Sequence, residues 1–355
     1  MTRPDAAFWR RKRVLITGHT GFKGGWLTIW LASMGAETHG LALAPPAGPN
    51  LFGVARVGDD MASSTITDIR NLTDVSAVVA RVRPEIVFHL AAQAFVRASY
   101  ERPVETYEVN VMGTVHVLEA LRAAPGATAL VNVTSDKCYD NQEWPWGYRE
   151  SDPMGGHDPY SSSKGCAELV TAAYRRSFLE GAGLAVSTAR AGNVIGGGDW
   201  APDRLVPDVF RALDARTTLR VRSPKATRPW QHVLEPVAGY LILAERLHAE
   251  GTAFSGSWNF GPDPDAVRPV GWVVEHLASV RPDLVWELDT TAQPPEAHSL
   301  KLDSSKAREG LGWRPRWSLA SALGRTAEWH AAWKRGDDMA AITRAHIDDY
   351  LRDDA

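Results

Sequence analysis

The sequence predicts an α/β fold, with a doubly wound parallel sheet in the first half of the chain and a smaller, mixed α/β lobe in the second. In the first half, short runs rich in β-branched residues alternate with longer helix-like stretches, which is typical of βαβ units. Beyond Arg190 this alternation stops, and Gly, Pro and Trp interrupt shorter segments. A chain of 355 residues also exceeds what one hydrophobic core usually serves. We therefore expect two domains, 8–190 and 191–340, with some segments of the second returning to the first.

The strands of the sheet are expected where apolar or β-branched runs are bounded by polar residues. The first of them is an unpunctuated apolar run, as expected when helices cover both faces of the sheet. The predicted strands are Arg13–Thr17, Thr38–Leu43, Ser64–Thr67, Ile86–Leu90, Leu130–Thr134 and Val186–Arg190. Helices are predicted between them, near residues 22–34, 73–82, 104–123 and 160–181.

Composition excludes several classes of protein. Lys and Arg total 39 against 42 Asp and Glu, with no basic block, so nucleic acid is not an expected partner. No apolar run approaches the roughly 20 residues that span a bilayer, and the charged segment before Val14 does not resemble a signal sequence. Cys138 and Cys166 cannot form a disulfide framework or a four-ligand zinc site, so we expect a cytoplasmic protein without a metal.

A glycine motif directly follows the first strand. Gly18, Gly21 and Gly24 lie in GHTGFKG and open a predicted helix, the context of a Rossmann-type dinucleotide site. Such glycines let the backbone approach a pyrophosphate, and the helix N-terminus offers free N–H groups to it. Thr20, Phe22 and Lys23 of the same loop are expected cofactor contacts. The alternative is an ordinary glycine-rich turn.

The second strand does not decide between NAD and NADP. Its end, Thr38–Leu43, carries neither the acid expected for a ribose 2′-hydroxyl nor an arginine. Asp68 follows the third strand and is a candidate for the adenine side of the cofactor. An Asp at a strand end is equally often a turn former.

Tyr160 and Lys164 form a candidate catalytic pair in PYSSSK. They are four residues apart on a predicted helix and so share a face. A phenol has a pKa of about 10, and a neighbouring ammonium, aided by a nicotinamide ring, stabilises the phenolate. With the strand-end Thr134, the pair resembles the Ser/Thr-Tyr-Lys set of the short-chain dehydrogenase/reductase family.

An acid and an amine, Asp136 and Lys137, directly follow Thr134 at the sheet edge where ligands bind. Their segment, TSDKCYDNQEWPWGYRESDPMGGHDPYSSSK, together with GHTGFKGGWLTIWL, RAGNVIGGGDWAPDRLVPD and TRPWQHVLEP, resembles the CDP-glucose 4,6-dehydratases of the extended short-chain dehydrogenase/reductase family. The simpler alternative is a polar loop with a solvated ion pair.

The resemblance implies a lyase that converts CDP-D-glucose to CDP-4-dehydro-6-deoxy-D-glucose through an internal NAD⁺/NADH cycle, in deoxysugar biosynthesis for O-antigen or a related polysaccharide. Tyr160 would take the O4 proton, Thr134 would hydrogen-bond O4, and Lys164 would hold the nicotinamide ribose. Asp136 would be the acid for the departing hydroxyl and Lys137 the C5 base. Their individual roles stay open, because an ionised Asp beside a protonated Lys has both protons in the wrong places.

The same resemblance carries ligand contacts onto further positions, each of which could equally be polar because its loop is exposed. The expected substrate contacts are Gln93, Asn193, Asp199, Trp200, Arg204, Arg228, Glu296 and His298. The expected cofactor contacts, besides the glycine loop, Asp68, Tyr160 and Lys164, are Ile69, Leu90, Ala91, Ala92, Gln93 and Asn110. His89 is expected to support its strand. Relatives commonly form homo-oligomers, dimers or tetramers, through the helices near 104–123 and 160–181.

Most of the 14 tryptophans follow Asp199. We expect Trp200 and Trp230 near the substrate. The later ones, Trp313, Trp317, Trp329 and Trp333, are expected to pack the small lobe.

Three alternatives share parts of these motifs. A sugar-nucleotide 4-epimerase needs the glycine loop, Thr, Tyr and Lys, but has no need of Asp136 and Lys137. A 4,6-dehydratase of another nucleotide sugar would keep the whole set. A non-enzymatic dinucleotide sensor would keep only the glycine loop.

Overall fold

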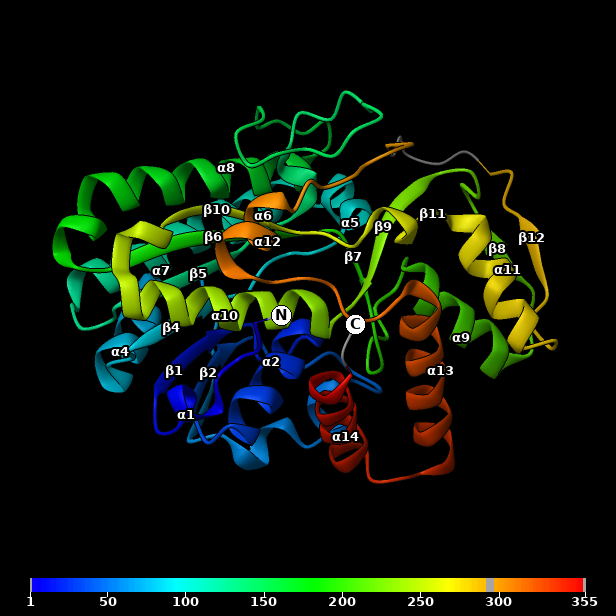
Figure 1. Cartoon of the computed structure of the whole chain (residues 1–355), viewed down its shortest axis with the longest axis horizontal. Helices are drawn as coiled ribbons and strands as arrows, with labels where there is room; N and C mark the ends of the chain where they lie inside the picture. The colour runs from blue at the N-terminus through cyan, green and yellow to red at the C-terminus, as the bar shows by residue number, and fades with distance from the viewer. Residues whose placement is uncertain (1, 292–296, 354–355) are drawn as a thin grey trace.

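The computed structural model describes residues 2–291 and 297–353, and its centre is a seven-stranded sheet (Figure 1). Every neighbouring pair of strands in this sheet is parallel, which confirms the predicted doubly wound fold. The strand order is β10-β6-β5-β4-β1-β2-β3, so the order reverses between β1 and β4. The strands are β1 (Arg13–Thr17), β2 (Glu37–Ala42), β3 (Ser63–Ile66), β4 (Ile86–His89), β5 (Ala129–Val133), β6 (Ala185–Ala191) and β10 (Gly256–Phe260). The crevice at such a reversal, beyond the carboxyl ends of the strands, is where ligands bind in this class of fold.

Helices follow the strands in alternation, as predicted. The expected helix at 104–123 is broken by a π-helical turn, Glu108–Met112, and the one at 160–181 ends its regular part at Tyr174. The helices are α1 (Ala6–Trp9), α2 (Phe22–Ser33), α3 (Leu51–Val54), α4 (Leu72–Val82), α5 (Val96–Glu101), α6 (Pro103–Tyr107), α7 (Gly113–Ala123), α8 (Pro159–Tyr174), α9 (Leu205–Ala215), α10 (Leu234–Glu250), α11 (Val270–Val280), α12 (Ser305–Leu311), α13 (Leu319–Arg335) and α14 (Met339–Arg352). None of the helices in these described residues has the length and hydropathy needed to cross a membrane.

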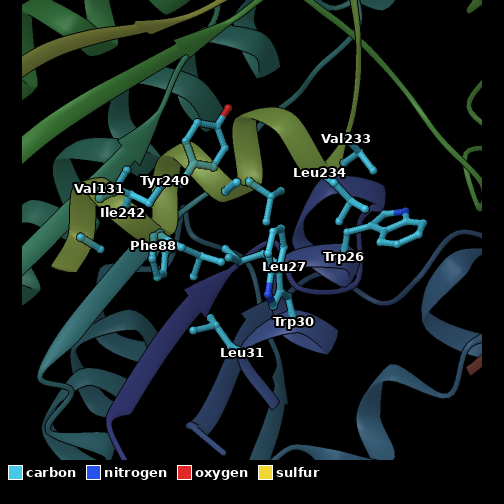
Figure 2. Close-up of a cluster of buried hydrophobic side chains, with 14 of the residues drawn as sticks. Trp26, Leu27, Trp30, Leu31, Phe88, Val131, Val233, Leu234, Tyr240 and Ile242 are labelled. Atoms are coloured by element: carbon cyan, nitrogen blue, oxygen red, sulfur yellow. The ribbon is translucent and has the colours of Figure 1, made fainter. Parts of the chain in front are cut away.

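The two faces of the sheet bury separate hydrophobic clusters, because side chains alternate along each strand. Val14 and Ile16 of β1 lie in one cluster with residues of α2 and α10, whereas Leu15 lies in the other with residues of α4 and α7. Figure 2 shows Trp26 and Trp30 of α2 near Leu234 and Tyr240 of α10, with Phe88 and Val131 of the sheet beside them.

The smaller lobe follows β6 and carries its own core. It contains a three-stranded sheet of order β11-β9-β7 and a two-stranded sheet, β12-β8. These strands are β7 (Asn193–Ile195), β8 (Leu219–Val221), β9 (Thr227–His232), β11 (Val267–Pro269) and β12 (Trp286–Leu288). The helices α9, α11 and α13 contribute to the same core. The division at residue 190 stays a prediction, and both β10 and α10, which follow it, build on the large sheet.

The late tryptophans correct one expectation. Trp313, Trp317 and Trp329 belong to the core cluster that contains α2, not to the core of the small lobe. The chain returns to the first domain after the lobe, and α14 packs against α2. Trp230 is buried in the small-lobe core, where its Nε1 donates to the Arg268 carbonyl at 3.0 Å; its expected place near the substrate stays a prediction.

Candidate active site

The glycine loop between β1 and α2 is packed backbone against backbone. Gly18 has φ +80°, and a Cβ there would lie 2.8 Å from the Ala91 nitrogen. A Cβ at Gly24 would lie 2.1 Å from the Gly18 carbonyl oxygen. Gly21 caps α2 without a side-chain hydrogen bond, so the first N–H groups of a twelve-residue helix keep their capacity for a ligand. This arrangement fits a pyrophosphate group.

The other residues of the loop have mixed surroundings. The Thr20 hydroxyl donates to the Leu43 carbonyl at 2.9 Å, and Phe22 is half-buried. The Lys23 ammonium lies 3.3 Å from the Tyr240 hydroxyl. Burial, together with the charges of Arg204 and Lys164, lowers the pKa of Lys23 to about 7. The charges of predicted site residues therefore act on the Lys23 ammonium.

At the adenine side, Asp68 forms an ion pair with Arg70 at 2.6 Å, and that hydrogen bond holds the pKa of Asp68 below its ordinary value. Ile69 is buried and packs against Gly113. A Cβ on Gly113 would lie 2.5 Å from Cδ1 of Ile69. His19 covers Gly40 at the end of β2 and hydrogen-bonds Ser64 at 2.7 Å. An imidazole therefore packs against Gly40 within β2, and the strand ends without an acid.

The loop after β4 closes the cradle from the other side. The amides of Leu90 and Ala91 both donate to the Thr17 hydroxyl at 3.1 Å, and Ala92 continues the loop half-buried. His89 hydrogen-bonds Thr17 at 2.7 Å and Thr114 at 3.1 Å, and burial lowers its pKa to about 3. His89 is therefore neutral and makes two hydrogen bonds, and it supports its strand as expected.

Gln93 and Asn110 bond mainly to the protein. The Gln93 amide contacts Phe95 and Thr106, and its main chain exchanges two hydrogen bonds with the Asn110 side chain. Asn110 also donates to Ser163 at 2.8 Å. Both residues thus shape the loop beside the cofactor position, and any ligand contact of theirs stays a prediction.

A short turn follows the end of β5 and carries the predicted acid and base. It consists of Ser135 and the 3₁₀ turn Asp136–Cys138, and we call it the catalytic turn. The Ser135 hydroxyl donates to Asp136 Oδ1 at 3.0 Å and accepts from the Lys137 amide at 3.2 Å. The same side chain is the hydrogen-bonding neighbour of the Tyr160 phenol. Ser135 therefore connects the carboxylate of Asp136, the backbone of Lys137 and the phenol of Tyr160.

Thr134 does not have the expected role. Its hydroxyl donates to the buried carboxylate of Glu168, and its amide continues the strand ladder to Ala189. Since neighbouring residues of an extended chain point to opposite sides, Thr134 and Ser135 cannot both face Tyr160. Ser135 was not among the predicted site residues, although its position directly before Asp136 was an available signal.

Tyr160 and Lys164 are both buried on α8, which Asp158 caps by accepting from the Ser161 amide. Burial raises the pKa of Tyr160 to about 12, and the hydrogen bond with Ser135 opposes that rise. Burial lowers the pKa of Lys164 to about 8, with the charge of Glu168 opposing. Burial thus outweighs the lowering of the Tyr160 pKa that was expected from Lys164.

Asp136 is 3% exposed, and burial raises the pKa of its carboxyl. Its Oδ2 has no hydrogen-bond partner among the described residues. Lys137 is half-buried beside it. A buried carboxyl group with a vacant oxygen is suited to giving a proton to a bound hydroxyl.

Two arginines reach the same site from the small lobe. The charge of Arg228 acts on Asp136, and that of Arg204 acts on Tyr160. Arg204 is paired with Asp199 at 3.0 Å and lies over the Phe95 ring. Arg228 also donates to the His298 carbonyl at 3.4 Å.

The remaining predicted substrate contacts are less closely tied to the centre. Trp200 packs edge-on against Trp329 and Trp333, Asn193 is half-buried on β7, and His298 is exposed. Glu296 lies outside the described residues. A cavity of about 620 Å³ beside α8, lined by Glu168, Thr188 and Lys306 among others, contains none of the predicted site residues.

Comparisons with known proteins agree with this geometry. The family model described as GDP-mannose 4,6 dehydratase matches residues 15–326. The chain is 52% identical over 353 residues to the CDP-glucose 4,6-dehydratase of Salmonella typhimurium, covering 98% of each chain.

Solved structures show the same fold at lower identity. MoeE5 in complex with UDP-glucuronic acid and NAD is 24% identical with a TM-score of 0.76, covering 91% of this chain and 99% of that one. The dTDP-glucose 4,6-dehydratase of Bacillus anthracis in complex with NAD is 20% identical with a TM-score of 0.75, covering 92% and 99%. By its sequence and fold, the chain belongs to the GDP-mannose 4,6-dehydratase family of extended short-chain dehydrogenases/reductases.

Proposed function

We propose that this protein converts CDP-D-glucose to CDP-4-dehydro-6-deoxy-D-glucose and water. The observation that carries the proposal is the buried Asp136, with its vacant oxygen, joined through Ser135 to Tyr160. An epimerase has no use for this acid, whereas a dehydratase must protonate a departing hydroxyl. The choice of cytidine rests on the Salmonella typhimurium relative.

NAD is the proposed cofactor, and the backbone cradle of Gly18, Gly21 and Gly24 fits its pyrophosphate. The loop Leu90–Gln93 and the Asp68–Ile69 segment would border the nicotinamide and adenine ends. When bound, NAD⁺ accepts the C4 hydride of the sugar and returns it to C6 later in the cycle. The protein supplies position and proton transfer.

In the first half of the reaction, Tyr160 takes the proton of the sugar O4 as phenolate. Because burial raises its pKa to about 12 in the protein alone, the positive charges of Lys164 and the oxidised cofactor must stabilise the phenolate. Ser135 supports O4 from the turn. The C4 carbonyl that results acidifies the neighbouring C5–H bond.

In the second half, Lys137 takes the C5 proton and Asp136 gives a proton to the departing C6 hydroxyl. Burial favours the neutral carboxylic acid that this step requires of Asp136. After hydride has reached C6, C5 regains its proton. Arg204 and Arg228 are proposed to bind the diphosphate, which suits the planar guanidinium group. Asn193, Asp199 and Trp200 would contact the rest of the nucleotide sugar.

We also propose a homo-oligomer. Exposed apolar side chains gather on α6, α8 and the turns joined to them, including Val104 at 70%, Leu169 at 60% and Phe178 at 49% exposure. The helices α6 and α7 both contact α8. A second copy covering this face would remove these side chains from water, and sedimentation equilibrium measures it. A cytoplasmic location is likewise proposed, and the two free cysteines suit a reducing compartment.

The deciding experiment is incubation of the purified protein with NAD⁺ and CDP-glucose. We expect a 4-keto-6-deoxy product without net formation of NADH. CDP-galactose as the product would establish an epimerase instead. A dehydrated product from dTDP-, GDP- or UDP-glucose alone would overturn the choice of base, and no reaction with any of these sugars would favour a dinucleotide sensor.

A further inference from the structure

A buried ion pair lies behind the catalytic turn and has no part in the proposed chemistry. The side chains of Glu168 and Arg190 are 4% and 2% exposed. The Arg190 guanidinium binds the carboxylate of Glu168 in a bidentate manner, with Nε donating to Oε1 at 2.9 Å and Nη2 donating to Oε2 at 2.8 Å. Although burial acts to raise it, the hydrogen bonds from Arg190, Thr134 and Thr188 hold the pKa of Glu168 below its ordinary value. The pair is therefore ionised and fixed in geometry.

This ion pair reaches both ends of the catalytic turn. The Thr134 hydroxyl, directly before Ser135, donates to Glu168. Arg190 Nη1 donates at 2.6 Å to the hydroxyl of Tyr139, which directly follows Cys138. Tyr139 in turn donates to Asn259 of β10 at 2.7 Å. One salt bridge thus holds the residues directly before and directly after the turn, Thr134 and Tyr139.

The same carboxylate belongs to the helix that carries the other catalytic residues. Glu168 follows Lys164 by four residues and Tyr160 by eight, so all three lie along one face of α8. Ser135, Asp136 and Lys137 come from a separate element, the end of β5. Proton transfer needs residues of both elements to meet the same sugar.

We propose that Glu168 and Arg190 are positioning residues that set the distance and orientation between the catalytic turn and the Tyr160–Lys164 face of α8. The kinetic part of this inference rests on the proposed function. Neither residue touches the substrate, so their effect passes through Thr134 and Tyr139. Displacements of about 1 Å can cost a reaction on the order of 100-fold.

Two threonines allow a matched test. Thr134 and Thr188 each donate one hydroxyl to Glu168, but Thr188 belongs to β6 and has no link to the turn. Thr134→Val and Thr188→Val therefore each remove one hydroxyl donor from the same carboxylate, Thr134 from Oε1 and Thr188 from Oε2, where Ser257 also donates at 3.2 Å. We expect Thr134→Val to lower kcat at least about 10-fold with KM for CDP-glucose unchanged, and Thr188→Val to stay within about 2-fold of the wild type. Thr134→Ser, which keeps the donor, should restore kcat.

Hydrogen–deuterium exchange of the full chain supplies a readout without activity. In Thr134→Val the amides of the catalytic turn should exchange faster, whereas in Thr188→Val they should match the wild type. Equal exchange of the turn in both variants overturns the positioning role, even if Thr134→Val is slow, because Thr134 would then act directly.

Equal losses of kcat in the two valine variants also overturn it, since a merely stabilising network would treat both hydroxyls alike. A wild type that is inactive on every nucleotide sugar refutes the proposed function, and the exchange comparison then decides the positioning role by itself.

Discussion

Asp136 combines burial, a raised pKa and a carboxylate oxygen without a partner. A structural carboxylate in a protein core is normally satisfied by several donors, as Glu168 is. Asp136 Oδ2 has no hydrogen-bond partner among the described residues, so it keeps its capacity to bond a ligand group, and Ser135 keeps the other oxygen oriented.

Asp136→Asn should separate the two halves of the reaction. An amide cannot give a proton to the departing hydroxyl, so formation of the 4-keto-6-deoxy product should fall by at least about 100-fold. Oxidation at C4 should persist, visible as the absorbance of reduced nicotinamide in a single turnover. Asp140→Asn, at a half-exposed position just outside the turn, is the matched control. Unchanged dehydration in Asp136→Asn would remove this residue from the acid role.

The error at Thr134 shows where residue-level prediction from sequence fails. The predicted strand ended at Thr134, whereas β5 ends at Val133. Because neighbouring residues of an extended chain point to opposite sides, choosing Thr134 in place of Ser135 selects the other side of the chain, and we propose Ser135 for the role that the sequence assigned to Thr134. Tyr160 and Lys164 both lie within one regular helix, so their position on a shared face could be predicted from their spacing alone.

At the scale of elements, the glycine loop and the start of α2 form a single packed unit. Gly24 lies inside the helix, yet its Cα faces the carbonyl of Gly18 in the preceding turn. A side chain there would have to displace backbone, which has no rotamer with which to yield. A Cβ at the next residue, Gly25, would instead meet side-chain atoms, Leu51 Cδ2 at 2.8 Å and Val57 Cγ2 at 3.7 Å.

Gly24→Ala should therefore weaken NAD binding by at least about 10-fold, because the cradle must open to admit the methyl group. Gly25→Ala is the control, since its new Cβ would lie 2.8 Å from the movable Leu51 Cδ2 and leave the loop intact. Isothermal titration with NAD measures both affinities, and thermal unfolding reports any common loss of stability. Equal affinities in the two variants would contradict this account of the cradle.

Most of the large sheet could be predicted because short strand-like runs alternate with longer helical stretches, and because β1 and β4 are nearly continuous apolar runs. The six expected strands all exist; the first has its predicted bounds, and the bounds of the others differ by at most one residue. The seventh, β10, could not be predicted from its neighbours, because Gly256–Phe260 follows the whole of β7 to β9 and its pairing with β6 is a long-range contact. The break at Glu108–Met112 was also missed, since a π-helical turn leaves the apolar pattern of a helix nearly intact.

At the scale of the whole molecule, the C-terminal segment is tied to α10 through Glu235. Its carboxylate accepts from the Tyr350 hydroxyl at 2.6 Å and from the amides of Arg316 and Trp317. Burial nevertheless raises the pKa of Glu235 to about 7 from 4.5. The folded protein therefore holds this proton more tightly than the unfolded chain does.

The sign of the pH effect follows from that difference. The stabilisation is complete below about pH 4.5 and is lost as the pH rises to about 7, because the unfolded chain gives up the proton first. At about 1.4 kcal/mol per pH unit, the free energy of unfolding should fall by on the order of 3 kcal/mol over this range.

Glu235→Gln should flatten that fall, as seen in urea midpoints measured across the same range. Glu328→Gln, at a position 63% exposed, should leave the profile unchanged. Identical profiles for Glu235→Gln and the wild type would show that the pKa of Glu235 is the same in the folded and unfolded states.

The place of β10 in the sheet also sets an order of events during synthesis. When β6 leaves the ribosome, the side of it that β10 will cover has no partner, and it stays so until residues up to Phe260 have emerged. An uncovered strand edge is a template for pairing with other chains. The growing polypeptide therefore passes through a stage in which the exposed edge of β6 can pair with other chains. Because much of the small lobe is synthesised between β6 and β10, the lobe prolongs this stage.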